Sequence, residues 1–335
     1  MVNHVQFPGL GLSFTLNRVA FTLFGKDIYW YGILIALGMA LAMAFAFHYA
    51  REFGVDADRM VDVILVGVVG AIISARAYYV IFAPRPYETL WDMINIRDGG
   101  LAIYGTVIAG FLVALIYTRV KKLKLGAMTD LCVMGLILGQ CIGRWANFIN
   151  REAFGGLTDL PWRMRLWTSA TQYIEVHPTF FYESLWNLVG LLLMLFVVTR
   201  GRRFDGENTW FYFLWYGLGR SWVEGLRTDS LYLFDWTFMG EPIRVSQALS
   251  MVMVVVAAGM LFYNLAVKKR SAEDLLVNQM AKAALAAESP ETDASLTGSA
   301  VEETVESQEK APASAEQAEK ELAAEREEED DGDAH

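Results

Sequence analysis

Two short polar stretches interrupt a chain that is otherwise rich in apolar residues. The first, residues 143–155, carries Arg144, and the second, residues 216–227, carries Arg220. Ionisable side chains at membrane depth are costly unless they are paired or hydrated, so they usually mark function. A guanidinium group presents a planar fork of hydrogen-bond donors that suits phosphate and stays charged when it is partly desolvated. The two arginines therefore predict an anion site, with a phosphodiester headgroup as the leading ligand.

Helical spacing would gather each polar stretch on one face. Residues three or four positions apart share a face of an α-helix. The two predicted faces are Arg144, Asn147 and Arg151 in the first stretch, and Tyr216, Arg220, Glu224 and Arg227 in the second. The alternative is structural, with Arg144 extended to the membrane interface and Arg220 paired with Glu224. Two arginines with amide and carboxylate neighbours favour the anion site over that alternative.

Three further polar or aromatic positions could contribute to such a site. His177 precedes Pro178, which suits the first turn of a helix, and Glu183 then lies about one turn inside that helix. His177 could act as a base, although a capping or interface role fits it as well. Tyr31 could equally be an aromatic-belt residue, and the glycines around Tyr104 could serve helix packing alone.

The composition indicates a membrane body with an acidic tail. Of 335 residues, 54% are hydrophobic, and the formal net charge is −10. From Ser271 to His335 there are 19 acidic and 4 basic residues, which leaves 19 acidic and 24 basic residues in 1–270. The tail has no Trp, Tyr or Phe, so it cannot bury enough apolar surface to order itself. We therefore expect a membrane domain over residues 1–270 and a disordered acidic tail over residues 271–335.

The apolar blocks predict an all-α integral membrane protein. Each block is long enough for a helix to cross about 30 Å of hydrocarbon. An eighth span would need residues 156–178 to cross, and that stretch is too polar. Its strand-like alternation instead predicts an exposed extracytoplasmic insertion at about residues 151–178. The seven predicted spans are residues 29–50, 61–82, 99–118, 127–145, 179–199, 208–226 and 243–267.

Basic loop residues predict the orientation of these spans. Lys and Arg are concentrated around residues 51–59, 119–124, 200–203 and 268–270, which alternate with the less basic loops. The positive-inside rule then places the N-terminus outside and the acidic tail in the cytoplasm. This topology brings one set of residues to the extracytoplasmic side, namely Tyr31, Arg76, Tyr104, Arg144, His177 and Arg220.

The first polar stretch resembles the signature of the prolipoprotein diacylglyceryl transferases. Its matching residues, after Gly143, are Arg144, Asn147, Phe148, Asn150, Glu152 and Gly155. Further segments resemble that family in the same order along the chain. They are residues 7–9, Trp30-Tyr31-Gly32, residues 70–79, His177-Pro178-Thr179 with Tyr182-Glu183, and residues 216–224. The resemblance covers roughly residues 5–267 and leaves the acidic tail outside.

The resemblance implies a multi-pass enzyme of the bacterial cytoplasmic membrane, with its active site facing the extracytoplasmic side. Such enzymes transfer the diacylglyceryl group of phosphatidylglycerol to the thiol of a lipobox cysteine in a preprolipoprotein signal peptide, and glycerol 1-phosphate leaves. No metal, nucleotide or other cofactor and no nucleic-acid partner is expected. The resemblance implies catalytic roles for Arg144, Arg220, Tyr104 and Tyr31. It implies phosphatidylglycerol binding by Arg144, Asn147, Asn150, Glu152, Gly155, His177, Tyr216, Arg220 and Glu224.

Tyr104 departs from the family pattern, because many members carry histidine in the matching position. Thr106 likewise replaces the second glycine of their His-Gly-Gly run. A tyrosine has an ordinary pKa of about 10 and is a poor base near neutrality. Either Tyr104 orients the substrate, which we expect, or the arginine field draws off its proton.

Two other functions fit some of the same features. Membrane arginines also line permeation paths, which would suit a transporter of an anionic solute. A transporter predicts polar residues through the inner halves of the spans, whereas residues 191–198 and 251–261 are apolar. A scaffold that works through the acidic tail would lose its function when residues 271–335 are deleted, and the enzyme would not.

Overall fold

The computed structural model of the chain describes residues 3–82, 87, 89–96, 99–169, 171–228, 232–238 and 241–288. It divides into two compact units, residues 1–281 and 282–335. Residues 289–335, which hold most of the predicted acidic tail, lie outside the described residues.

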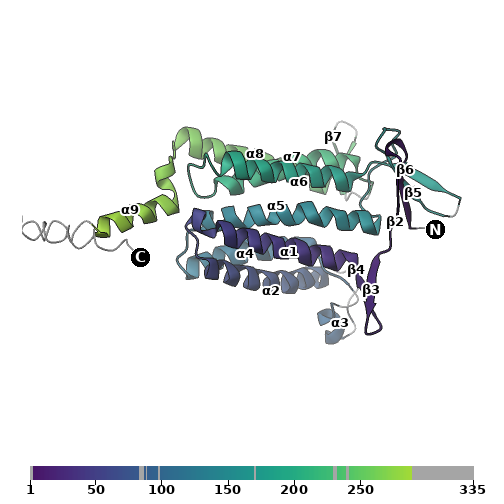
Figure 1. Cartoon of the computed structure of the whole chain (residues 1–335), viewed down its shortest axis with the longest axis horizontal. Coiled ribbons are helices and arrows are strands. Elements are labelled where there is room, and N and C mark those ends of the chain that lie inside the picture. Colours follow the sequence, from purple (N-terminus) through teal and green to yellow (C-terminus); the bar gives the residue numbers. More distant parts are fainter. Residues whose placement is uncertain are drawn as a thin grey trace, which may run out of the picture. The chain divides into compact units, whose positions relative to one another are not determined.

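Long helices build the first unit (Figure 1). They are α1 (Trp30–Tyr49), α2 (Ala57–Ile81), α4 (Ile103–Val120), α5 (Leu125–Asn150), α6 (Thr179–Leu193), α7 (Glu207–Leu226) and α8 (Val245–Phe262). Shorter helical segments extend or join them. These are η2 (Ala50–Phe53), α3 (Leu90–Ile94), η3 (Met194–Val198) and η4 (Tyr263–Val267).

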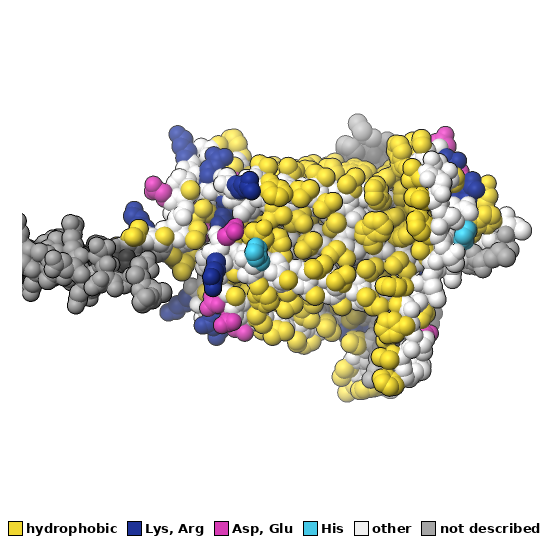
Figure 2. Space-filling model, in the orientation of Figure 1, with side chains coloured by type: hydrophobic (Ala, Val, Ile, Leu, Met, Phe, Trp, Pro, Cys, Tyr) yellow, Lys and Arg dark blue, Asp and Glu magenta, His cyan; other side chains and the backbone are white. Residues whose placement is uncertain are grey.

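In the part of the chain that the structure describes, five helical segments are long and apolar enough to cross a membrane. They are residues 30–53, 57–81, 125–150, 179–198 and 245–267, and a shorter apolar helix covers residues 105–120. Apolar side chains cover the middle of the face seen in Figure 2, and charged side chains gather toward its two ends. The predicted helical membrane fold is confirmed. The count of seven crossings stays a prediction, because α7 is not among the five and α4 is shorter.

Helix α5 lies in the centre of the bundle. It packs against α1 on one side and against α6 and α7 on the other (Figure 1). Small residues allow the close approach to α1, since the α-carbon regions of Gly38 and Gly139 face each other, as do those of Ala42 and Gly135. The position of α5 matters for function because this helix carries Arg144 near its C-terminal end.

Short strands cover the end of the bundle where α5 ends and α6 begins. A four-stranded antiparallel sheet has the order β2-β1-β5-β6, made of β1 (His4–Phe7), β2 (Leu12–Thr15), β5 (Met164–Trp167) and β6 (Tyr173–Val176). Its buried residues Val5 and Leu166 pack in one cluster with Phe148 of α5 and Phe180 of α6. The sheet thereby holds the end of α5 against the start of α6. The strand-like alternation of the insertion agrees with β5 and β6, whereas β1 and β2 were not predicted.

Two antiparallel hairpins complete the described strands. The first pairs β3 (Val19–Leu23) with β4 (Lys26–Tyr29), and β4 leads directly into α1. The second pairs β7 (Tyr232–Phe238) with β8 (Glu241–Arg244), which leads into α8. Each hairpin therefore precedes a helix at the same end of the bundle, so both are placed to border a site there (Figure 1).

Residues 271–281 of the predicted tail belong to the first unit and lie at the end of the bundle opposite the sheet. Residues 271–288 contain η5 (Ala272–Asp274) and α9 (Leu276–Glu288). Asp205 accepts a hydrogen bond from the Leu276 backbone N–H at 2.9 Å, and Leu275 is buried. Composition assigned these residues to a disordered tail because it does not register such tertiary contacts. The division at residue 270 remains a prediction.

Candidate active site

The carboxylate of Glu183 is the centre of an arginine cluster at the sheet-covered end of the bundle. Glu183 Oε2 lies 2.5 Å from Arg144 Nη2, and Glu183 Oε1 lies 3.7 Å from both Arg220 Nη1 and Arg227 Nη1. These residues come from α6, α5, α7 and the residue after α7. The structure therefore brings together the two polar stretches, as the sequence predicted, through a carboxylate from a third helix.

Glu224 supplies the second carboxylate of the cluster. It is 2% exposed, and its Oε2 lies 2.5 Å from Arg220 Nη2, one helical turn earlier on α7. Arg244 donates from Nη1 to the backbone carbonyl oxygens of Glu224 and Arg227. Arg220 is thus held between the carboxylates of two helices. Such pairing allows a guanidinium group to remain charged in a partly desolvated place.

A reciprocal tryptophan pair fixes α6 against α7 close to Glu183 and Arg220. Trp186 donates from Nε1 to the Trp215 carbonyl at 3.0 Å, and Trp215 donates to the Trp186 carbonyl at 2.9 Å. The two indole rings stack with their centroids 4.4 Å apart. A Cβ atom added at Gly219 would overlap the Trp186 indole, so the helices approach this closely only because residue 219 has no side chain.

Hydrogen bonds at the end of α5 join three predicted site residues. Asn147 and Asn150 both donate from Nδ2 to Glu152 Oε1, at 3.0 and 3.2 Å. The helix ends because Arg151 takes a left-handed conformation with φ 53°, which turns the chain back toward Glu152. Burial and the neighbouring charge of Arg18 lower the pKa of the Arg151 guanidinium.

Gly155 and His177 pair near the two ends of the segment that connects α5 to α6. The Gly155 N–H donates to the His177 carbonyl at 3.0 Å, and Gly155 forms a β-bridge with Arg227. His177 Nδ1 lies 3.4 Å from the Tyr182 hydroxyl oxygen, whereas no ion pair of the described cluster includes the imidazole. His177 is therefore linked to the arginine cluster through Gly155, which pairs with both His177 and Arg227.

An apolar groove of about 600 Å³ begins at Arg144 and Asn147 and runs between α1 and α5. Tyr216 lines its polar end, and Met60 and Leu131 line its inner end. The rest of its lining is mainly apolar and includes Ile35, Met39, Met43, Ile64, Cys132 and Leu136. From Arg144 to Cys132, α5 rises by about 18 Å at 1.5 Å per residue. That length is close to one leaflet, about half of a 30 Å hydrocarbon core.

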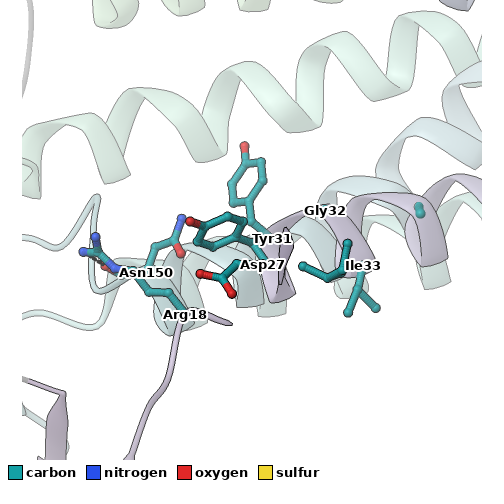
Figure 3. A pocket seen from close by; sticks show the side chains of 9 residues that line it. Arg18, Asp27, Tyr31, Gly32, Ile33 and Asn150 are labelled. Atoms are coloured by element: carbon teal, nitrogen blue, oxygen red, sulfur yellow. Dashed lines mark hydrogen bonds between the residues drawn. The ribbon is translucent and has the colours of Figure 1, made fainter. Parts of the chain in front are cut away.

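Tyr31 belongs to both this groove and a second pocket of about 740 Å³. The second pocket lies where hairpin β3–β4, the first turn of α1 and the end of α5 meet. Figure 3 shows Arg18, Asp27, Tyr31 and Asn150 around it. Arg18 donates from Nη2 to the Asn150 carbonyl at 2.7 Å, which links the hairpin to α5.

Arg76 does not join the arginine cluster, although sequence topology brought it to the same side. It donates to the backbone carbonyl oxygens of Asp92, Met93, Gly99 and Gly100 at 2.5 to 2.9 Å. It therefore holds the segment that leads into α4. Tyr104 lies in the first turn of that helix.

The sequence does not predict the central place of Glu183. It puts this residue one turn inside a span and in a segment that resembles the family, whereas the structure pairs it with three arginines. The signal was present, because a carboxylate within an apolar span is subject to the same cost as an arginine.

Comparison with known proteins shows the family of this chain. A model of the family described as prolipoprotein diacylglyceryl transferase matches residues 18–263. The phosphatidylglycerol–prolipoprotein diacylglyceryl transferase of Clostridioides difficile is 40% identical over 241 residues, covering 72% of this chain and 92% of the relative. The protein of the same name from Finegoldia magna is 42% identical over 241 residues, with the same two shares. That of Thermotoga maritima is 38% identical over 247 residues, covering 72% of this chain and 82% of the relative. The chain therefore belongs to the prolipoprotein diacylglyceryl transferase family.

Proposed function

We propose that this protein transfers the diacylglyceryl group of phosphatidylglycerol to the lipobox cysteine thiol of a preprolipoprotein. The relatives that share about 40% of its residues carry the name of that activity. The observation that carries the proposal is the position of three arginines around one carboxylate at the head of an apolar groove.

The groove and the cluster suit the two halves of the donor lipid. Acyl chains would lie along α5 among apolar side chains, and the phosphate would lie at Arg144. A guanidinium group carries five N–H donors, and the ion pairs with Glu183 and Glu224 involve only Nη2 of Arg144 and the two Nη atoms of Arg220. An arriving phosphodiester can therefore accept hydrogen bonds from Arg144 and Arg220, and Asn147 and Tyr216 lie within the same groove.

The reaction breaks a carbon–oxygen bond and forms a carbon–sulfur bond. The cysteine thiolate attacks the glycerol carbon that carries the phosphate ester, and the bonding electron pair leaves on the ester oxygen. The thiol proton passes to solvent, so the released glycerol 1-phosphate carries one more negative charge than the original diester. Arginine donors aimed at that oxygen bind the leaving group more strongly as this charge develops, which lowers the barrier.

The other site residues would position these arginines and the substrates. Glu183 and Glu224 hold Arg144 and Arg220 from two helices, while Glu152 orients Asn147 and Asn150. We keep substrate orientation as the role of Tyr104. A thiol has an ordinary pKa of about 8.5, so a positive field is enough to favour its thiolate.

We place the site on the extracytoplasmic side of the bacterial membrane. The N-terminus would then lie outside and the acidic tail in the cytoplasm. The basic segments near residues 51–59, 119–124, 200–203 and 268–270 support this orientation.

A lipid-transfer assay tests the proposal. Vesicles that contain the protein and phosphatidylglycerol labelled in its acyl chains are incubated with a lipobox peptide, and a peptide with serine in place of the cysteine is the control. We expect label on the cysteine peptide only, together with release of glycerol phosphate. No label on either peptide would overturn the proposal, and passage of an anionic solute across the same vesicles would favour a transporter.

A further inference from the structure

The transfer reaction needs a binding place for the peptide as well as for the lipid. The pocket beside Tyr31 has an apolar side and a polar rim, which suit a peptide. This inference rests on the proposed function. The pocket is separate from the apolar groove except at Tyr31, which lines both. Asn150 of the pocket lies six residues after Arg144 on α5, which corresponds to about 9 Å along the helix. A thiol held in the pocket is therefore close to the head of the lipid groove.

The pocket changes character along its length. Ile28, Ile33 and Ala36 give it an apolar side next to α1, and Arg18, Asp27 and Asn150 give it a polar rim. A secretory signal peptide has an apolar segment followed by small residues at the processing site. In a substrate of this kind the reacting cysteine stands where apolar chain gives way to polar chain. The two ends of the pocket match the two ends of such a segment.

The strand that borders the pocket can also bind an extended backbone. Three consecutive residues of β4, Asp27, Ile28 and Tyr29, line the pocket. Since side chains alternate in a strand, consecutive residues reach one cavity where it runs along the edge of the strand. Among the described residues β4 pairs only with β3. An extended peptide can add to such an edge through main-chain hydrogen bonds.

The rim supplies polar groups of both kinds. The Arg18 guanidinium already reaches the Asn150 carbonyl, and the Asp27 carboxylate accepts a hydrogen bond from Thr22 at 2.7 Å. Asp27 is exposed and can accept a second hydrogen bond from a peptide N–H. The positive charge of Arg18 in the same pocket favours a thiolate over a thiol nearby.

We propose that this pocket binds the acceptor peptide, an extended segment whose apolar part ends at the reacting cysteine. The peptide lies between β4 and the first turns of α1, and its thiol points past Tyr31 toward Arg144.

Crosslinking tests the place of the peptide directly. A photo-crosslinking amino acid replaces Ile33 in the pocket, Met43 in the lipid groove, or Leu37, which lines neither cavity and is exposed. The probe is a labelled lipobox peptide with serine in place of cysteine. We expect peptide adducts at residue 33 that excess unlabelled peptide removes, and only background at 37 and 43. Equal labelling at 33 and 37, or labelling mainly at 43, would overturn the proposal.

Kinetics supply a second, independent readout. A Cβ atom at Gly32 meets no neighbouring atom within 4 Å, so Gly32→Val should fold and place its side chain in the pocket. We expect its KM for the peptide to rise at least about fivefold, with the KM for phosphatidylglycerol unchanged. Ala40→Val, at an exposed position outside both cavities, is the matched control. An unchanged peptide KM in Gly32→Val contradicts the proposal. Crosslinking of the peptide in the residue-33 variant, together with no lipid transfer by the wild-type protein, would instead overturn the proposed function.

Discussion

Two clusters of buried charge lie at opposite ends of the helix bundle, and they differ in what surrounds them. We call the cluster around Glu183 the outer cluster and the cluster around Asp130 the inner cluster, after the orientation proposed above. In the outer cluster, three arginines share the carboxylate of Glu183, and one of them, Arg144, lines a large apolar groove. In the inner cluster, Asp130 of α5 caps the start of α7. Its oxygens accept hydrogen bonds from the Gly206 N–H, the Thr209 N–H and the Thr209 hydroxyl, each at 2.8 Å.

Arg202, the arginine of the inner cluster, is enclosed by protein atoms as Asp130 is. Arg202 is 5% exposed, its guanidinium carbon lies 3.9 Å from the centroid of the Phe53 ring, and Nη2 donates to the Glu52 carbonyl at 3.2 Å. Burial lowers the pKa of Arg202, while the charge of Asp130 opposes that shift. The contrast teaches that buried charge alone does not identify an active site. Several cations that share one carboxylate beside a cavity are the more specific sign.

Removal of one arginine from each cluster should produce opposite defects. We expect Arg144→Ala to keep the fold and to lose transfer by about 100-fold or more, because a leaving-group donor is lost. We expect Arg202→Ala to lower the free energy of unfolding by about 3 kcal/mol, because it leaves the buried Asp130 without its cation. Lipid transfer per folded molecule and thermal melting would be measured for both. Loss of transfer in Arg202→Ala at an unchanged melting temperature would break the comparison.

Replacement of Glu183 and Asp130 by their amides tests the difference between the two clusters more finely. Glu183→Gln should lower kcat by about tenfold or more, because charge-assisted bonds that orient Arg144 and Arg220 weaken. Glu183→Asp, which keeps the charge, should recover part of kcat. Asp130→Asn should instead reduce stability by about 2 kcal/mol, because the cap loses an acceptor oxygen and the buried Arg202 loses its carboxylate, with kcat retained. Equal kcat losses in Glu183→Gln and Asp130→Asn would contradict the distinction.

The glycine beside the tryptophan pair tests how the outer cluster is kept in register. Gly219→Ala would overlap the Trp186 indole and should cost about 1 to 3 kcal/mol of stability through overpacking, with lowered transfer. Gly259→Ala on α8 is the matched control, since an added Cβ meets nothing within 4 Å there. Equal melting temperatures and equal transfer rates in the two variants would show that the helix spacing at Gly219 does not position the arginine cluster.

The smallest expected effect concerns pH and the outer sheet. Hydrogen bonds from Arg165 and Arg163 lower the pKa of the Glu175 carboxyl, which joins β5 to β6. A lowered folded-state pKa contributes stability above the unfolded-state pKa, and that stability is lost as pH falls through the folded-state value. The protection factors of the β5–β6 amides, which are corrected for the pH dependence of intrinsic exchange, should therefore fall in acid. Glu175→Gln should abolish this dependence, and an unaltered pH profile in that variant would argue against the assignment.

Much of the site follows from residue type and spacing, because membrane depth makes polar residues informative. Arg144, Asn147, Arg220 and Glu224 stand out for that reason alone. The role of Glu183 could not be predicted in the same way, because its partners come from other helices and depend on how α5, α6 and α7 pack. The strands β1 and β2 are too short to give a periodic signal, and β1 gains its partner β5 only through a pairing some 160 residues away in sequence.

The ordered start of the predicted tail is a similar case. Residues 275 and 276 become buried or hydrogen-bonded because Asp205 and Gly54 lie beside them, and no local pattern announces those neighbours. Composition therefore predicts a change from membrane body to acidic tail, but it does not predict these tertiary contacts of residues 275 and 276.

A structure of the protein with bound phosphatidylglycerol tests the central claim most directly. The account predicts the phosphate within hydrogen-bond distance of Arg144 and Arg220, with an acyl chain in the groove between α1 and α5. A phosphate bound elsewhere, with both arginines still closed on Glu183 and the groove empty of lipid, would contradict it.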